Sequence, residues 1–119
     1  MAKGDDIQEW LIHFAVQIIK LSSKLPKTTA GRHVSSQILR SGTSPAPNYG
    51  EARSAESTND FVHKLKVALK ELNETKVWLQ IITVSEMISV EDCAEVNKSC
   101  DELCRIISAS VWTVLKGKR

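Results

Sequence analysis

Hydrophobic residues recur at steps of three and four positions along the first part of the chain. This spacing is typical of an amphipathic helix with one face in a core, and it predicts a helix over about residues 6–24. The residues on that face are Ile7, Trp10, Leu11, Phe14, Ile18, Leu21 and Leu25. A second hydrophobic row, Ile12, Val16 and Ile19, lies on a different face. The helix is therefore either central in the fold or covered by another subunit.

A second periodic segment passes through Val34, Ile38 and Leu39 and predicts a helix over about residues 30–54. Pro45 and Pro47 interrupt this helix. Each proline lacks a backbone donor, and its ring clashes with the carbonyl group four residues earlier. We therefore expect a kink or a break near residues 45–47, after which a restarted helix has Pro45 in its first turn.

Two serine caps introduce the remaining helices. Ser57 begins an approximate capping box with Asp60, which predicts a helix over about residues 57–86. Ser89 precedes acidic residues that suit the positive end of a helix dipole, which predicts a helix over about residues 89–116. The sequence shows no alternating strand pattern. It predicts an all-α protein, an antiparallel up-down four-helix bundle that forms one domain over residues 1–119.

Polar residues occupy the segment from residue 40 to residue 51, where a bundle normally keeps hydrophobic ones. If the helix continues through the prolines, Ser41, Ser44, Asn48 and Glu51 share one face. Buried polar groups need partners. The interpretation that we favour is a hydrogen-bonded cluster that joins this segment to Glu71, Glu74 or Thr75 on the next helix. The alternative is a polar pocket or an oligomer contact that recognises a ligand.

Composition limits the class of protein. The 119 residues are 42% hydrophobic and 25% charged, which is typical of an ordered globular domain. The longest hydrophobic stretch, residues 10–19, contains His13 and Gln17 and is shorter than the roughly 20 residues that span a membrane. The chain also shows no secretory cleavage pattern. We therefore expect a cytoplasmic protein without a membrane partner.

Residues with catalytic or metal-binding chemistry are few and scattered. The three cysteines, Cys93, Cys100 and Cys104, lie on one predicted helix, where buried reduced thiols are favoured over zinc or a disulfide framework. Each histidine stands alone on its helix, and no inward Glu-x-x-His pair is present, so we expect no metal, no cofactor and no enzymatic activity. An enzymatic alternative places a site at Asn48, Glu51, Glu71 and Glu74.

The positions of the charged residues say more about possible partners than the net charge does. The formal net charge is only +2, too small in a monomer to establish nucleic-acid binding. Basic residues concentrate in the first two predicted helices and in the third. The candidate nucleic-acid contacts are Arg32, Arg40, Arg53, Lys64, Lys66 and Lys70. An ordinary solvated helix face accounts for them equally well.

One set of spacings is specific. It comprises Arg40-Ser41-Gly42-Thr43-Ser44, Asn48, Glu51-Ala52, Ala55-Glu56-Ser57, Asp60-Phe61, Lys64-Leu65, Ala68-Leu69-Lys70-Glu71, Glu74-Thr75 and Trp78-Leu79. It resembles the bacterial four-helix-bundle family named after proteins encoded in intervening sequences of 23S rRNA genes. The polar members of this motif are Arg40, Ser41, Ser44, Asn48, Glu51, Glu71 and Glu74. The chain departs from the family pattern at Pro45, Pro47, Tyr49 and Gly50, which affects the local helix geometry.

The resemblance implies a bundle that assembles into a homopentameric barrel. Related bundles include the accessory variability determinant of diversity-generating retroelements, which implies binding to nucleic acid and to a reverse transcriptase. Our first hypothesis is therefore a non-enzymatic, oligomeric protein that binds RNA or DNA through a basic surface, with Ile12, Val16 and Ile19 in the oligomer interface. The alternative is a protein-protein adaptor or assembly scaffold without nucleic-acid binding.

Overall fold

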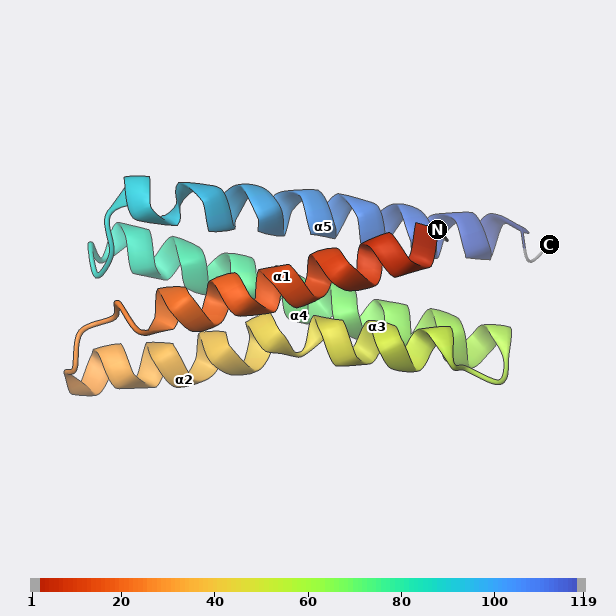
Figure 1. The fold of residues 1–119 in the computed structure, drawn as a ribbon, viewed down its shortest axis with the longest axis horizontal. Coiled ribbons are helices and arrows are strands. Elements are labelled where there is room, and N and C mark those ends of the chain that lie inside the picture. The colour runs from red at the N-terminus through yellow and green to blue at the C-terminus, as the bar shows by residue number, and fades with distance from the viewer. Residues whose placement is uncertain (1–2, 118–119) are drawn as a thin grey trace.

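The computed structural model describes residues 3–117, so residues 1–2 and 118–119 of the expected domain lie outside the described residues. The described residues form five helices and contain no strand. The helices are α1 (Lys3–Ser22), α2 (Thr29–Thr43), α3 (Pro45–Arg53), α4 (Thr58–Val84) and α5 (Val90–Gly117). In Figure 1, α2 and α3 follow one another along one edge, and the four resulting arms alternate in direction. The expectation of an all-α fold is confirmed.

The expected disturbance at the prolines is a break between α2 and α3. Ser44 separates the two helices with φ −71° and ψ −36°, a right-handed helical conformation that lets the chain continue in nearly the same direction. Pro45 starts α3, where its missing N–H group costs little. The backbone N–H group of Asn48 then donates to the Ser44 carbonyl at 3.2 Å and resumes the helical pattern. The arm is therefore two helices in line.

Side-chain caps fix the starts of three helices. The Ser57 hydroxyl accepts from the backbone N–H group of Asp60 at 3.0 Å, and the Ser89 hydroxyl accepts from that of Asp92 at 3.1 Å. The hydroxyl of Thr28 caps α2 in the same way. These bonds satisfy backbone donors that have no partner inside a helix. The two serine caps predicted from the sequence are confirmed.

A single hydrophobic cluster fills the centre of the bundle and draws on all five helices. The expected α1 row lies in it, with Leu11, Phe14 and Ile18 among the most deeply buried side chains. Trp10 is the exception, because it is 52% exposed. It lies at the margin of the α1 row, beside α5, where it lines an open hollow with His13 and Gln17. The assignment of Trp10 to the core is therefore wrong.

The order of the helices around the bundle separates α1 from α4. Each of these helices packs against α2, α3 and α5, whereas their own backbones do not approach within 8 Å of one another. They lie diagonally across a body that measures 49 × 24 × 23 Å. Their outward faces therefore point away from each other. None of the helices in residues 3–117 has the length and hydropathy needed to cross a membrane.

Close packing of α1 against α2 leads to a stability prediction. A Cβ atom on Gly42 would lie 2.7 Å from Cγ1 of Ile18, which is fully buried. We expect Gly42→Ala to lower the free energy of unfolding by about 1–2 kcal/mol, because the strain exceeds the gain in helix propensity. Urea denaturation followed by circular dichroism measures the change. Gly50→Ala is the matched control, because its Cβ atom would meet only the flexible end of Gln8. Equal destabilisation of the two variants would contradict the prediction.

Candidate functional site

Arg40 on α2 links two carboxylates of α4. Its Nη1 donates to Oε1 of Glu71 at 2.9 Å, and its Nη2 forms an ion pair with Glu74. The Glu71 side chain is only 12% exposed, so its charge depends on this guanidinium group. Gln37 and the Trp78 indole complete the arrangement, since Gln37 accepts from Nη2 of Arg40 at 3.2 Å and Nε1 of Trp78 donates to Glu74 at 3.1 Å. Arg40 therefore fastens α2 to α4.

A fully buried pair of hydroxyl groups lies beneath this ion pair. The hydroxyl oxygens of Ser41 and Thr75 are 2.9 Å apart, and the Thr75 hydroxyl is 2.8 Å from the Glu71 carbonyl oxygen. Each hydroxyl can donate once, so Thr75 can bond to the carbonyl while it accepts from Ser41. The links to Glu71, Glu74 and Thr75 that we favoured from the sequence are present.

The rest of the polar segment does not join this cluster. The side-chain amide of Asn48 donates to the carbonyl and the hydroxyl of Ser44, at 3.0 and 2.9 Å, within its own turn. Glu51 accepts from Nζ of Lys64 at 2.7 Å on the exposed surface. Ser44, Asn48 and Glu51 share α3 and its cap, but Asn48 and Glu51 bond to partners other than the α4 carboxylates of the cluster. The structure therefore does not bring together Asn48, Glu51, Glu71 and Glu74, the four residues of the enzymatic alternative.

The six basic residues predicted as nucleic-acid contacts fall into two groups. Arg40, Arg53 and Lys64 are ion-paired, with Glu71 and Glu74, with Asp5 and with Glu51 respectively. The hydrogen bond from Glu51, followed by its negative charge, raises the pKa of Lys64. Arg32, Lys66 and Lys70 are exposed, and the structure of residues 3–117 gives them no ion pair.

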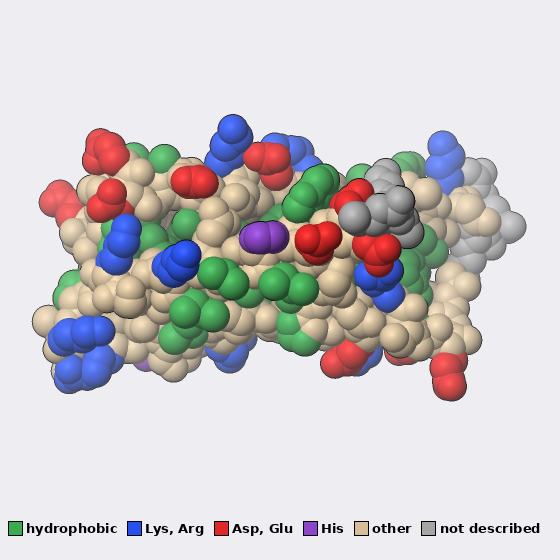
Figure 2. Space-filling model, viewed as in Figure 1, with side chains coloured by type: hydrophobic (Ala, Val, Ile, Leu, Met, Phe, Trp, Pro, Cys, Tyr) green, Lys and Arg blue, Asp and Glu red, His purple; other side chains and the backbone are tan. Residues whose placement is uncertain are grey.

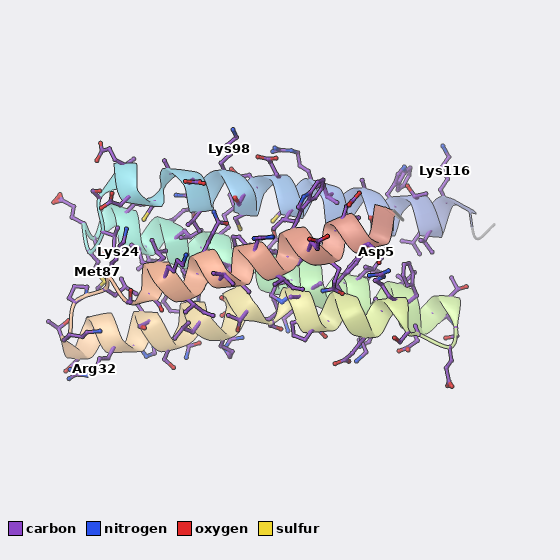
Figure 3. All side chains as sticks on the ribbon, viewed as in Figure 1. Asp5, Lys24, Arg32, Met87, Lys98 and Lys116 are labelled. Atoms are coloured by element: carbon purple, nitrogen blue, oxygen red, sulfur yellow. The ribbon has the colours of Figure 1, made fainter. Side chains whose placement is uncertain are left out.

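Three exposed basic residues without ion pairs in the described part of the chain lie where α1 connects to α2. Nη1 of Arg32 donates to the backbone carbonyl of Lys27 at 2.7 Å. Figure 3 places Lys24 beside the same end of the bundle. We call Lys24, Lys27 and Arg32 the basic end. Our sequence-based candidates omitted Lys24 and Lys27, although their proximity to Arg32 in the chain was a usable signal.

Acidic residues occupy the neighbouring corner of the same end. Glu86 lies in the connection between α4 and α5, and Glu91 and Asp92 lie in the first turn of α5. Figure 2 shows the resulting separation, with acidic side chains above and basic side chains below at the left end of the molecule. The bundle end is therefore divided into a basic corner and an acidic corner.

Two hydrophobic rows lie outside the core. Ile12, Val16 and Ile19 on α1 are 49%, 41% and 51% exposed, and Figure 2 shows hydrophobic side chains gathered over the middle of the face where α1 lies. We call these residues the α1 stripe. A second row on α4, which we did not predict, consists of Val77, Ile81 and Val84 at 52%, 40% and 83% exposed. We call it the α4 stripe.

The three thiols lie on α5, and those of Cys100 and Cys104 face α4. Cys93 and Cys100 are buried, Cys104 is partly buried, and all three are reduced. Burial, and then the nearby charge of Asp92, raises the pKa of Cys93. The Cys100 thiol donates to the Leu72 carbonyl oxygen at 3.4 Å, and its hydrogen-bond interaction with Cys104 raises the pKa of Cys100 and lowers that of Cys104. In residues 3–117, no group of three or more His, Cys, Asp or Glu side chains is placed to hold a metal ion.

Comparisons with known proteins agree with this architecture. The family described as 23S rRNA-intervening sequence protein matches residues 6–109. The chain is also similar to a protein of unknown function from the S23 ribosomal protein family of Bacteroides thetaiotaomicron, known from a crystal structure. The two are 35% identical over 92% of this chain and 98% of that one, with a TM-score of 0.86. No curated protein matches the chain.

Proposed function

Because this chain belongs to the 23S rRNA-intervening sequence protein family, we propose that it is a non-enzymatic, cytoplasmic homo-oligomer that binds RNA or DNA through its basic end. The observation that carries the proposal is the cluster of Lys24, Lys27 and Arg32, which form no ion pair with a carboxylate of the described residues. Phosphate contacts by such side chains supply most of the sequence-independent affinity for nucleic acids.

Assembly of several chains would strengthen nucleic-acid binding by this small basic cluster. One chain carries a formal net charge of +2, and the homopentamer that we propose would carry about +10. Several basic ends on one particle could contact one nucleic acid together, and linked contacts raise affinity without any new kind of contact. The exposed α1 stripe supports self-association, because exposed hydrophobic patches mark interaction sites.

The ion-paired members of the original set are less suited to phosphate binding. A phosphate that binds Arg40 would compete with the carboxylates of Glu71 and Glu74, and the Glu71 side chain is nearly buried. Contact through Arg53 or Lys64 would break a pair with Asp5 or Glu51. Arg32 is therefore the member of the predicted set on which the proposal depends most.

We expect the double variant Lys24→Glu/Arg32→Glu to bind structured RNA and duplex DNA about tenfold or more weakly, because each reversal replaces a phosphate attraction by a repulsion. The slope of log affinity against log salt should also flatten by roughly one for each phosphate that the variant no longer neutralises. Fluorescence anisotropy at several salt concentrations measures both effects.

The matched control for this variant is Lys98→Glu/Arg105→Glu, which changes the net charge equally at exposed positions of α5. It should bind nearly as tightly as the wild type and keep the wild-type salt dependence. An equal reduction of affinity in the two variants would show that only net charge matters. Unchanged binding of the basic-end variant would refute the assignment.

The adaptor function is the second candidate, and the α4 stripe favours it. A monomer with two exposed hydrophobic rows would offer a surface for another protein. In that case substitutions in the stripes would abolish partner binding, and the basic-end variant would behave like the wild type.

A further inference from the structure

We propose that the oligomer forms by head-to-tail docking, in which the α1 stripe of one copy packs in parallel against the α4 stripe of the next copy. This inference rests on the proposed homo-oligomer and specifies its contact. The occupant of each stripe is thus a second copy of this chain, and three observations support that choice.

The first observation is the matching spacing of the two stripes. Ile12, Val16 and Ile19 are separated by four and three residues, and so are Val77, Ile81 and Val84. At 1.5 Å per residue each stripe is about 10 Å long and follows one side of its helix. Two straight stripes of equal length and spacing can pack side by side with the hydrophobic residues of each opposite those of the other.

The second observation is the diagonal position of the two helices. Because α1 and α4 lie across the bundle from each other, one chain cannot use one stripe to cover the other. An isologous contact between two α1 stripes would leave both α4 stripes exposed. A heterologous contact covers both stripes with one kind of interface and closes into a ring when the rotation between copies allows it.

The third observation is the charge at the ends of the stripes. Asp5 and Glu9 precede the α1 stripe and Lys20 follows it, whereas Lys66 and Lys70 precede the α4 stripe and Glu86 follows it. In parallel docking, Asp5, which also pairs with Arg53 of its own chain, falls opposite Lys70, since each lies seven residues before the first hydrophobic member of its stripe. Lys20 then falls near Glu86. Antiparallel docking would instead place Glu9 beside Glu86 and Lys20 opposite Lys76, which costs affinity.

One like-charged pair arises in this arrangement. Glu9 falls opposite Glu74 when the stripes are aligned. Glu74 is already held by Arg40 and by the Trp78 indole within its own chain, so its charge is compensated before docking. Lys70 lies one turn away and adds a positive charge between the two helices.

Parallel docking has a direct consequence for the proposed function. Every copy then points in the same direction, so all the basic ends lie on one rim of the ring. Lys70 becomes part of the contact between copies. Lys24, Lys27 and Arg32 remain outside the stripes and are left for phosphate.

Cross-linking between introduced cysteines tests the contact. Val16 and Ile81 are the central members of their stripes. In a Cys104→Ser background, we expect the double variant Val16→Cys/Ile81→Cys to give a ladder of linked species up to the full ring when treated with a short bismaleimide. Each single-cysteine variant should stay unlinked, because neither residue meets its own copy.

The possible outcomes separate this inference from the proposed function. Linked dimers from Val16→Cys alone would show an isologous contact and overturn the proposal. An oligomer by light scattering whose double variant gives no ladder would overturn the docking and leave the nucleic-acid proposal standing. A monomer by light scattering would overturn both the docking and the proposed assembly. A ladder without nucleic-acid binding would support the docking and refute the proposed function.

Discussion

Replacement of Arg40 by methionine is expected to lower the free energy of unfolding by about 2–3 kcal/mol. Glu71 accepts from Arg40 at 2.9 Å and its side chain is only 12% exposed, so the variant leaves a desolvated carboxylate without its cation. Methionine keeps much of the packing of the aliphatic stem, so the destabilisation reports mainly the charge. Urea denaturation at one fixed protein concentration measures it, because assembly makes stability depend on concentration.

Two control variants show whether the destabilisation arises from the unpaired carboxylate. Adding Glu71→Gln to Arg40→Met should restore part of the stability, since the substitution removes the uncompensated charge. Arg53→Met breaks an ion pair with Asp5 at the surface and should cost at most about 1 kcal/mol. If Arg40→Met and Arg53→Met are destabilised by the same small amount, Arg40 does not fasten α2 to α4 as described.

The double variant Ile12→Glu/Val16→Glu is expected to leave a folded monomer that binds structured RNA about 100-fold more weakly than the wild type. The two side chains are exposed in one chain, so the substitutions should not disturb the core. The introduced glutamates would place charge in the proposed contact between copies and so prevent assembly. The single basic end of a monomer then lacks the gain in affinity that linked sites give. Light scattering and fluorescence anisotropy measure the mass and the affinity.

Trp112→Glu provides the control for this variant. Trp112 is a large exposed hydrophobic residue on α5, outside both stripes. Because Trp112 lies outside the proposed contact, we expect the Trp112→Glu variant to keep the oligomer mass and the RNA affinity of the wild type. An Ile12→Glu/Val16→Glu protein that still assembles would remove the α1 stripe from the interface. A monomer with undiminished affinity would show that binding does not depend on assembly.

Much of the helical framework could be predicted because its causes are local. The caps at Ser57 and Ser89 and the break before Pro45 depend on residues close together in the chain. The hydrophobic period gives the core row of α1 apart from Trp10, whose exposure depends on how closely α5 approaches. The α4 stripe was missed because a helix with hydrophobic residues on two sides does not reveal from sequence which side faces the core.

The charged surface was less predictable, because ion pairs depend on distant partners. Arg53 pairs with Asp5, which lies 48 residues earlier, and Arg40 pairs with Glu71, which lies 31 residues later. The second pair could be anticipated from the polar positions of neighbouring helices, whereas the first depends on the N-terminal turn of α1 reaching the end of α3. Asn48 and Glu51 do not join the polar cluster, because Asn48 bonds to Ser44 within its own turn and Glu51 pairs with Lys64.

The most direct test of the central claim is a fluorescence-anisotropy titration of the purified protein, sized by light scattering, against structured RNA and duplex DNA at several salt concentrations. The account predicts a particle of about 66 kDa, five times the 13.2 kDa of one chain. Its affinity should fall steeply as salt rises. An intact oligomer that binds neither nucleic acid at low salt would contradict the claim and favour the protein adaptor.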